Sequence, residues 1–483
     1  MLFNSLDFFI FLPVVFIIYW SLFSKNVKLQ NCFILMASYV FYGMWDWRFL
    51  FLILASTIVD YIVGQFIHKN ESNHLKKRWL LVSVIFNICL LGFFKYYNFF
   101  IDSWVDFVTI FGYEIQSSWT LKIILPVGIS FYTFQTMSYS LDIYYKRLTP
   151  TKDFISFATF VSFFPQLVAG PIERASNLLS QITVKRTFNY RQCKEGLKLI
   201  LWGLFKKVVI ADSIAPIVDD IFANYHDYSA STLILGVALF SFQVYGDFSG
   251  YSDIAIGTSK LFGIELMSNF KFPNFSRNMA EYWQRWHISL STWFRHYVYI
   301  PLGGSRVSKL KSIRNICVIF LVSGFWHGAN WTFIVWGAIH AILYIPVFLM
   351  GRNRIYMNNV VAENRWLPSI KEIGQILLTF SLVTFSRVFF RSESITDAYG
   401  FLKQLYYNFY FEIYEHPLGY RMIDYFILLA LFIIYEFRIR RDERSPFKFK
   451  SKIIRFIAYT LVILGMLLFF DDNIDRSFIY FQF

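Results

Sequence analysis

Residues 316–348, ICVIFLVSGFWHGANWTFIVWGAIHAILYIPVF, form the stretch that decides the fold. It contains no Lys, Arg, Asp or Glu and is longer than the roughly 20 apolar residues that cross a bilayer. Its polar side chains include two imidazoles, His327 and His340. Ionisable groups at membrane depth usually mark a site. Either histidine can therefore accept a proton in a reaction or simply be hydrogen-bonded across a packed helix pair, and the stretch alone leaves both interpretations open.

The spacing of glycines around His327 indicates a close contact. Gly324 and Gly328 lie four residues apart, the spacing at which small residues let a second helix or a narrow acyl chain approach a helix backbone. We expect one of these two partners beside His327.

Composition sets the fold class. The chain has 483 residues, of which 56% are hydrophobic, 21% aromatic and only 16% charged. A water-soluble protein cannot cover that much apolar surface. Apolar stretches of membrane length recur along the chain, and the first, residues 7–23, lacks the basic start and cleavage site of a signal peptide. We predict an all-α integral membrane protein with about ten to twelve transmembrane or re-entrant helices, plus interfacial amphipathic helices.

The net charge of +14 does not indicate nucleic acid binding. The 46 Lys and Arg residues stand mostly in short clusters between apolar runs, which is typical of cytoplasmic loops. This orientation puts the N-terminus and the acidic residues 471–475 outside the cell. The four cysteines have no spacing typical of a disulfide framework or a metal site. We therefore predict no metal.

Residues 154–266 are harder to assign, because Pro165, Pro171, Lys206, Lys207 and several glycines interrupt the apolar runs. This pattern predicts short, broken or re-entrant helices that line a cavity buried in protein.

Residues 270–306 mix charged and aromatic side chains too densely for a simple span. On a continuous helix Trp283, His287 and Ser291 share one face. We predict an interfacial amphipathic helix here, with His287 either functional or only hydrogen-bonded within an aromatic belt.

Several motifs together resemble the membrane-bound O-acyltransferase (MBOAT) family, and within it the bacterial members that O-acetylate polysaccharides such as alginate. The resemblance covers nearly the whole chain. The residues that carry it are MLFNS at 1–5, PVGISFYTFQ at 126–135, VAGPI at 168–172, DFSGYSD at 247–253, WHISLSTWF at 286–294, YVYIPLGG at 297–304 and GFWHGANWT at 324–332. One departure is His296, where the family pattern has Asp, so this position receives no role.

The resemblance implies a single polytopic domain over residues 1–483, with a catalytic core at about 120–350 around a central tunnel. It implies that His327 is the principal catalytic base and His287 its polar partner. The side chains expected along the substrate tunnel are Trp283, Ser291, Trp326 and Asn330. A buried histidine suits acyl transfer, because the acceptor hydroxyl must lose a proton while water is kept from the thioester.

Asp247 and Asp253 follow an apolar stretch and have two interpretations. Carboxylates near membrane depth are costly unless they are paired or hydrated. They can form a polar wall of the tunnel or orient an imidazole, or they can belong to a cap or loop ion pair with Arg277 or Arg285.

The last residues, FIYFQF at 478–483, form an aromatic tail. Similar endings occur in bacterial acyl-transfer systems of this kind, which implies that Tyr480 carries the acyl group as a covalent relay. Its phenol needs activation by a base. The alternative is simple anchoring at the membrane interface.

The resemblance therefore predicts a multi-pass O-acetyltransferase of the bacterial cytoplasmic (inner) membrane that modifies an exported or cell-wall polysaccharide. We expect no bound cofactor, acetyl-CoA as the cytoplasmic acyl donor, and an extracytoplasmic acetyltransferase as partner, in a setting of membrane lipids. Two alternatives stay open, namely D-alanyl transfer to teichoic acid and a transporter or flippase in which histidines and aspartates relay protons.

Overall fold

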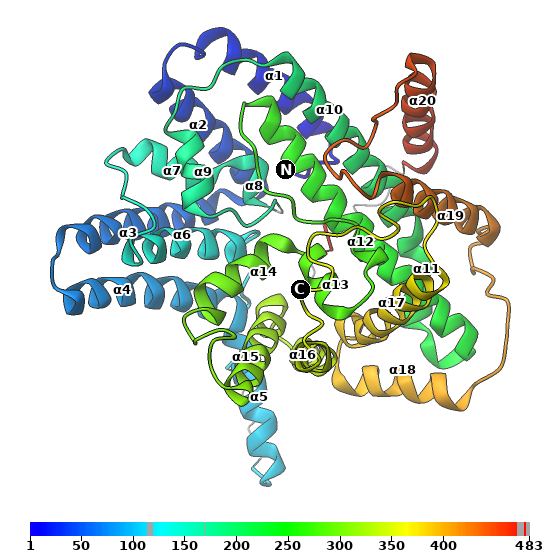
Figure 1. Cartoon of the computed structure of the whole chain (residues 1–483). Coiled ribbons are helices and arrows are strands. Elements are labelled where there is room, and N and C mark those ends of the chain that lie inside the picture. The colour runs from blue at the N-terminus through cyan, green and yellow to red at the C-terminus, as the bar shows by residue number, and fades with distance from the viewer. Residues whose placement is uncertain (114–118, 169, 471–477, 480–483) are drawn as a thin grey trace. The chain divides into compact units, whose positions relative to one another are not determined.

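The computed structural model of the chain describes residues 1–113, 119–168, 170–470 and 478–479. Every regular element in these residues is a helix (Figure 1), which confirms the predicted all-α class. The chain forms two compact units, one of Met1–Cys193 with Thr258–Leu266 and one of Lys194–Gly257 with Met267–Phe483. The acidic residues 471–475 and Tyr480 lie outside the described residues.

The first unit contains the amino-terminal helices. They are α1 (Leu6–Leu22), α2 (Val27–Asp46), α3 (Leu50–Lys69), α4 (Asn73–Leu91), α5 (Tyr97–Ile110), α6 (Ile129–Tyr144), α7 (Phe154–Ser162), α8 (Phe164–Leu167) and α9 (Ala175–Ile182). Helices α3, α4 and α6 pack against one another (Figure 1). Asp60 of α3 is fully buried at this contact and accepts hydrogen bonds from Ser83, Asn87 and Ser140. These donors satisfy a carboxyl group that would otherwise be costly to bury.

The second unit holds the remaining helices wholly or for the most part. They are α10 (Tyr190–Phe205), α11 (Ser213–Ala223), α12 (Ala230–Leu261), α13 (Met279–Arg285), α14 (Ile288–Phe294), α15 (Lys309–His327), α16 (Trp331–Leu349), α17 (Ile370–Arg391), α18 (Ile395–Tyr407), α19 (Met422–Ile439) and α20 (Lys452–Phe469). Short 3-10 and π segments occur in both units. The first unit contains η1 (Trp47–Phe49) and η2 (Gly92–Tyr96), and the second contains η3 (Lys206–Asp212), η4 (Tyr225–Asp227), η5 (Pro273–Phe275) and η6 (Arg295–Tyr299).

The described helices include six segments long and apolar enough to cross a membrane. They are Val27–Lys69, Asn73–Ile110, Ala230–Leu261, Trp331–Leu349, Ile370–Arg391 and Lys452–Phe469. The first two each contain two helices, and Leu6–Leu22 and Phe154–Leu167 are shorter apolar segments. The chain is a multi-pass membrane protein.

The region 154–266 is broken only in part. Helices α7, α8 and α9 are short, as predicted, but α12 continues unbroken through Asp247 and Asp253. Placing these carboxylates in a cap or loop was therefore wrong. The glycine at 250 does not end the helix because it lies against the backbone of Gly203 in α10, where a Cβ atom would overlap the Gly203 carbonyl oxygen. Tertiary packing outweighs the low helix propensity of glycine.

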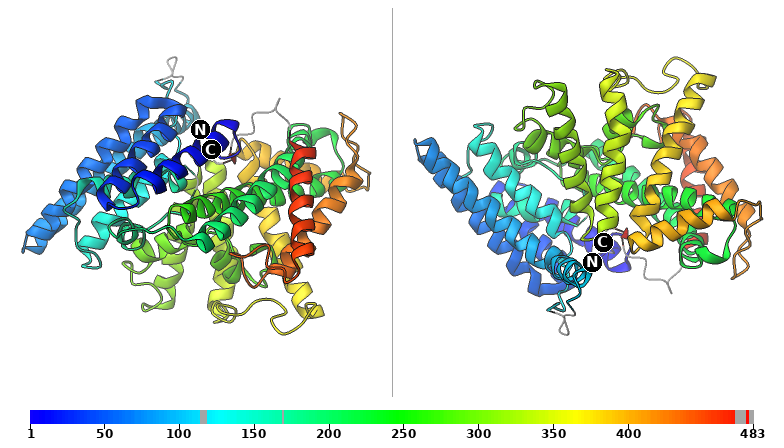
Figure 2. Two further views of the ribbon diagram at one scale, coloured as in Figure 1. Left: turned by 90° about the horizontal axis from the view of Figure 1, so that it is seen from above. Right: turned by 90° about the horizontal axis from the view of Figure 1, so that it is seen from below.

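Helices α15 and α16 form the hairpin that carries the stretch 316–348. A Cβ atom on Gly324 would overlap the carbonyl oxygen of Phe333, and one on Gly337 would overlap that of Phe320. The two glycines face each other, so the partner that approaches Gly324 is α16. Helix α16 also packs along α17, beside which it runs in Figure 2. This close contact fixes the carboxyl end of α15, where His327 lies.

We predict that Gly324→Ala lowers the apparent melting temperature of the detergent-purified protein by several degrees, because overpacking at a backbone contact costs about 1–3 kcal/mol. Gly374→Ala in α17 is the matched control, since a Cβ atom there meets nothing within 4 Å and alanine favours a helix. Equal melting temperatures for the two variants would contradict the packing described here.

Candidate active site

The segment around His287 is broken, and the predicted continuous amphipathic helix is wrong. Helix α13 ends at Arg285, Trp286 is extended, and His287 has φ 43° and ψ 54°. The amide of Ile288 donates to the carbonyl oxygen of Asn269 at 2.9 Å. This tertiary hydrogen bond replaces the helical one, and a non-glycine residue with positive φ is a strained conformation that often occurs at functional sites. Trp283, His287 and Ser291 therefore do not share one helix face.

Asn269 fixes the imidazole of His287. The Asn269 side-chain nitrogen donates to the Ser252 hydroxyl at 3.1 Å, so its Oδ1 faces His287 and Ser289. His287 Nδ1 lies 3.1 Å from Oδ1, and because a carbonyl oxygen only accepts, Nδ1 carries the proton. Nε2 is then the basic nitrogen of a neutral ring. Burial lowers the pKa of His287, which lies outside the six candidate spans, to about 3.

His327 lies close to His287 in an aromatic enclosure. It is the last residue of α15 and is only 3% exposed. The two imidazole centroids are 6.4 Å apart, and the Trp326 ring lies 6.0 Å from His287 and 5.1 Å from His327. The rings of Trp336 and Phe390 lie 5.1 and 5.6 Å from His327. The structure thus brings together the two histidines and the tryptophan that the sequence analysis singled out.

His340 has a different environment. Its Nε2 lies 3.0 Å from the hydroxyl of Ser386, which donates its own proton to the Val383 carbonyl oxygen and therefore accepts from His340. The ring packs against Trp283 and Trp336, with centroids 5.0 and 4.6 Å away. His340 matches the interpretation of a histidine hydrogen-bonded across a helix pair, here α16 and α17.

Two lysines that the sequence analysis treated only as interruptions neutralise the buried aspartates. Lys207 lies 2.8 Å from both Asp247 and Asp212, and Lys206 lies 2.7 Å from Asp253. Both lysines come from the π segment η3. The proposed partners Arg277 and Arg285 were wrong, because both bind Glu281 instead. Ion pairs were expected, but only the tertiary fold brings η3 to α12.

The carboxy-terminal residues 478–479 contact this cluster of lysines and aspartates. The backbone amide of Ile479 donates to Asp247 Oδ2 at 2.7 Å. The Phe478 ring is fully buried between Phe248 and Tyr251, with centroid distances of 5.5 and 4.4 Å. The relay predicted for Tyr480 falls on a residue outside the described ones.

A cavity of about 860 Å³, a volume typical of small-molecule sites, is lined by Ile288, which follows His287 in the chain, but neither His287 nor His327 lines it. Trp283 and Ser291 line it, as does Ser323, one turn before His327 on α15. Three arginines also line it, namely Arg295, Arg306 and Arg354. Within the part of the chain that the structure describes, these arginines form no ion pair, so their charges are available to a ligand.

Asn330, which was predicted to line the tunnel, does not line this cavity and instead caps a helix. Its Oδ1 caps α16 by accepting from the Thr332 amide at 3.0 Å, and its Nδ2 donates to the Glu393 carbonyl oxygen at 2.6 Å. These bonds close the loop that follows His327.

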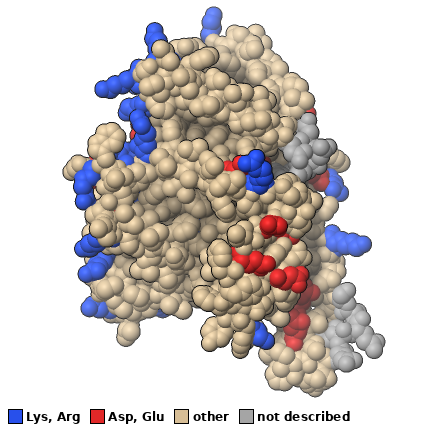
Figure 3. Space-filling model, turned by 90° about the vertical axis from the view of Figure 1, so that its right-hand side faces the viewer, with Lys and Arg blue, Asp and Glu red and all other residues tan. Residues whose placement is uncertain are grey.

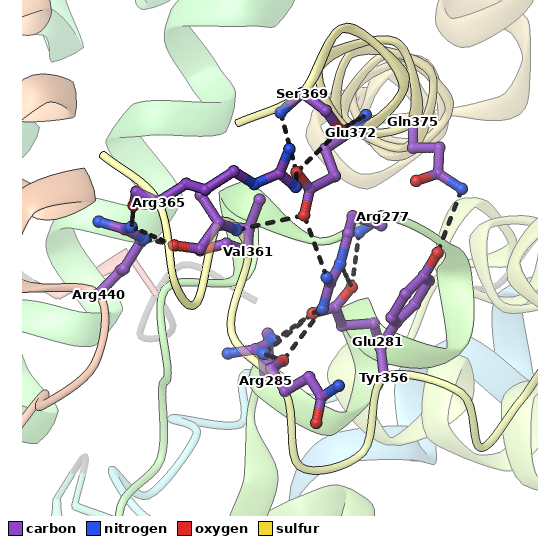
Figure 4. Close-up of polar contacts among 12 residues, drawn as sticks. Arg277, Glu281, Arg285, Tyr356, Val361, Arg365, Ser369, Glu372, Gln375 and Arg440 are labelled. Atoms are coloured by element: carbon purple, nitrogen blue, oxygen red, sulfur yellow. Dashed lines mark hydrogen bonds and ion pairs between the residues drawn. The ribbon is translucent and has the colours of Figure 1, made fainter. Parts of the chain in front are cut away.

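A network of charged side chains holds the loop 351–369, which supplies Asn353, Arg354 and Met357 to the cavity (Figure 4). Arg277 and Arg285 converge on Glu281 and also donate to the Asn359 carbonyl oxygen. The remaining contacts are made by Glu372 with Arg277, Arg365 and Ser369, and by Arg440 with the carbonyl oxygens of Val361, Ala362 and Arg365. The network keeps one cavity wall in place.

The fold and the site define a multi-pass membrane enzyme that encloses two imidazoles beside a cofactor-sized cavity. The sequence profile of the MBOAT, membrane-bound O-acyltransferase, family matches residues 79–362. The chain belongs to this family and is an O-acyltransferase. Among the described residues, no group of three His, Cys, Asp or Glu side chains is placed to hold a metal ion.

Curated relatives agree with this assignment. The chain is 39% identical over 408 residues to the "Probable alginate O-acetylase AlgI" of Pseudomonas aeruginosa, which covers 84% of this chain and 75% of that protein. It is 38% identical over 432 residues to the peptidoglycan O-acetyltransferase of Helicobacter pylori, covering 83% and 79%. A teichoic acid D-alanyltransferase of Streptococcus thermophilus is 30% identical over 307 residues, covering 58% and 70%.

We predict that nitrogen NMR of histidine-labelled protein finds His287 neutral and protonated at Nδ1 from pH 8 down to pH 5, because its pKa is lowered to about 3. The unfolded chain takes up this proton near pH 6.5, so His287 destabilises the fold progressively as the pH falls from about 6.5 towards 3. Assignment uses the signal that disappears in His287→Gln. Titration of this signal near pH 6.5 would contradict the burial and the hydrogen bond to Asn269.

Proposed function

We propose that this enzyme moves an acetyl group from a cytoplasmic thioester donor, acetyl-CoA, to the outer side of a bacterial cytoplasmic membrane for O-acetylation of an exported or cell-wall polysaccharide. The observation that carries the proposal is the 6.4 Å approach of His287 and His327 beside the arginine-lined cavity. Two relatives that align over more than four fifths of this chain are named for acetylation of alginate and of peptidoglycan.

We assign the arginine-lined end of the cavity to the cytoplasmic side. The loop with Arg306 leads into Lys309, Lys311 and Arg314, and short basic loops face the cytoplasm. In Figure 3, Asp and Glu side chains gather at the lower right of the view, while Lys and Arg stand along the left and upper edges and at a few places on the right. Guanidinium groups pair well with phosphates, so a donor carrying several phosphates suits this end. His327 lies about 20 Å further along the helix from Arg314.

The chemistry needs one base and one nucleophile. His327 takes the phenolic proton of Tyr480 while the phenolate oxygen attacks the thioester carbonyl. The carbon–sulfur bond breaks, the thiolate receives the proton from His327, and an acetyl ester remains on Tyr480. A sugar hydroxyl then attacks this ester, and Tyr480 regains its proton. His287 supports this exchange as a neutral hydrogen-bonding partner, and the aromatic enclosure limits hydrolysis by keeping water out.

We further propose that an extracytoplasmic acetyltransferase partner completes the transfer to the polymer. D-alanyl transfer is the runner-up, supported by the teichoic acid D-alanyltransferase, which aligns with a smaller part of this chain. The transporter alternative is set aside, since the chain belongs to an acyltransferase family.

We predict that His327→Ala abolishes transfer of radiolabelled acetyl groups in membranes, with a loss of at least about 100-fold, the usual contribution of a general base. Label held covalently on the protein should disappear in both His327→Ala and Tyr480→Phe. His340→Gln is the matched control and should keep most activity if the protein remains folded. Covalent label that remains on the protein in Tyr480→Phe would contradict the role of Tyr480 as acyl carrier. Unchanged glycan acetylation in His327→Ala would contradict the role of His327 as general base. Labelled D-alanine in place of acetate tests the runner-up.

We predict that Arg354→Gln raises the KM for acetyl-CoA roughly tenfold and leaves kcat nearly unchanged, because it removes a charged contact to a phosphate that is the same in ground and transition states. Arg352→Gln is the control, since Arg352 is exposed two residues away and does not line the cavity. Equal KM values for both variants would place the donor phosphates elsewhere.

A further inference from the structure

The buried triad Asp212–Lys207–Asp247 takes no part in the acyl-transfer steps described above. Lys207 Nζ lies 2.8 Å from each carboxylate, and the side chains of Lys207 and Asp247 are only 2% and 3% exposed. Burying ions is costly even when they are paired, so a donor that reaches Asp247 stabilises the cluster.

The carboxy-terminal segment supplies that donor. Asp247 binds Lys207 through Oδ1 and accepts the Ile479 backbone amide through Oδ2 at 2.7 Å. A hydrogen bond to an ionised acceptor is about twice as strong as one between neutral groups. The amide belongs to the main chain, so this contact holds the position of the tail whatever side chain stands at 479.

Two aromatic side chains of the same helix hold Phe478, the residue before Ile479. Phe248 and Tyr251 of α12 flank Phe478, which has no exposed surface. The Phe248 ring also lies 4.7 Å from the ring of His287. A single aromatic ring therefore separates Phe478 from the histidine pair, and all of these residues belong to the second unit.

We propose that Asp247, held in place by Lys207, forms with Phe248 and Tyr251 a docking site for the chain's own carboxy-terminal segment. Asp247 is a positioning residue, because it binds the backbone next to Tyr480 and not the reacting atoms. The consequence for Tyr480 rests on the proposed function, while the docking of residues 478–479 does not.

The same helix supplies a matched comparison. Asp253 lies six residues beyond Asp247, forms an ion pair with Lys206 at 2.7 Å and has a side chain that is 16% exposed. Its carboxylate makes no hydrogen bond to residues 478–479 of the described tail. Asp253 variants therefore remove a lysine-paired carboxylate of the same helix that makes no hydrogen bond to residues 478–479.

The test measures access to the tail without any acyl donor. In a full-length chain whose four native cysteines are replaced by alanine, Ile479→Cys reports how fast a maleimide reaches position 479. Loss of a charged hydrogen bond should raise the labelling rate roughly tenfold or more in Asp247→Ala. Asp253→Ala should change it less than twofold. Asp247→Asn, which keeps an acceptor oxygen but loses the charge, should fall between them.

Ala398→Cys in a separate chain controls for unfolding, since Ala398 is fully buried in α18 of the same unit. If Asp247→Ala also raises the labelling rate at position 398, the variant is partly unfolded. The labelling rate at position 479 is then compared between Asp247→Asn and Asp253→Asn. Equal labelling of position 479 in the Asp247 and Asp253 variants would overturn the docking site.

Acetyl transfer measured on the same membranes distinguishes the docking site for residues 478–479 from the acyl relay at Tyr480. A released tail with lost transfer supports both the docking site and the relay. A released tail with unchanged glycan acetylation keeps the docking site and rejects the Tyr480 relay. A tail that stays inaccessible in the Asp247 variants rejects the docking site, whatever happens to the acetyl group.

Discussion

Buried polar groups need partners, and this constraint organises the second unit of the protein. Where the surroundings are apolar, an unpaired charge or hydrogen-bonding group costs several kcal/mol. Lys207 therefore stands between Asp212 and Asp247, and Glu281 between Arg277 and Arg285. The pair Lys207–Asp247 joins η3 to α12, and Arg277 and Arg285 also donate to the Asn359 carbonyl oxygen. The partners that satisfy these buried groups therefore also determine where η3, α12 and the loop 351–369 lie.

Much of the fold follows from local sequence. The apolar runs predict helices, and the charge-free stretch 316–348 forms the hairpin of α15 and α16. Gly324 lies against α16, one of the two partners that its spacing from Gly328 allowed. The errors come from tertiary contacts. Glycines near Asp247 suggested a break, but packing against α10 keeps α12 whole. The i, i+4 spacing at Trp283 suggested a helix, but the bond between Ile288 and Asn269 ends it.

The candidate site was only partly predictable. His327 and His287 stand out in the sequence itself, family motifs gave these two histidines and Trp326 their roles, and the structure brings the three rings together. Asn269 was missed because nothing in its neighbourhood distinguishes one asparagine from another before the fold is known. Lys206 and Lys207 offered a usable signal, since two adjacent lysines inside an apolar run need carboxylate partners. The sequence could require such partners but could not say which carboxylates the fold brings near.

The break in the helix at His287 explains how residues 283–291 contribute side chains both to the cavity and to the buried surroundings of His287. A continuous helix would turn Trp283, His287 and Ser291 to the same side. With the backbone of His287 in the left-handed region, Trp283 and Ser291 line the cavity, while His287 turns to Asn269 and Trp326 and has no exposed surface. In the proposed function, a donor held at the arginine-lined cavity is hydrated there while the imidazole stays buried. Since acyl transfer competes with hydrolysis, the strain at one residue separates the wet part of the site from the dry part.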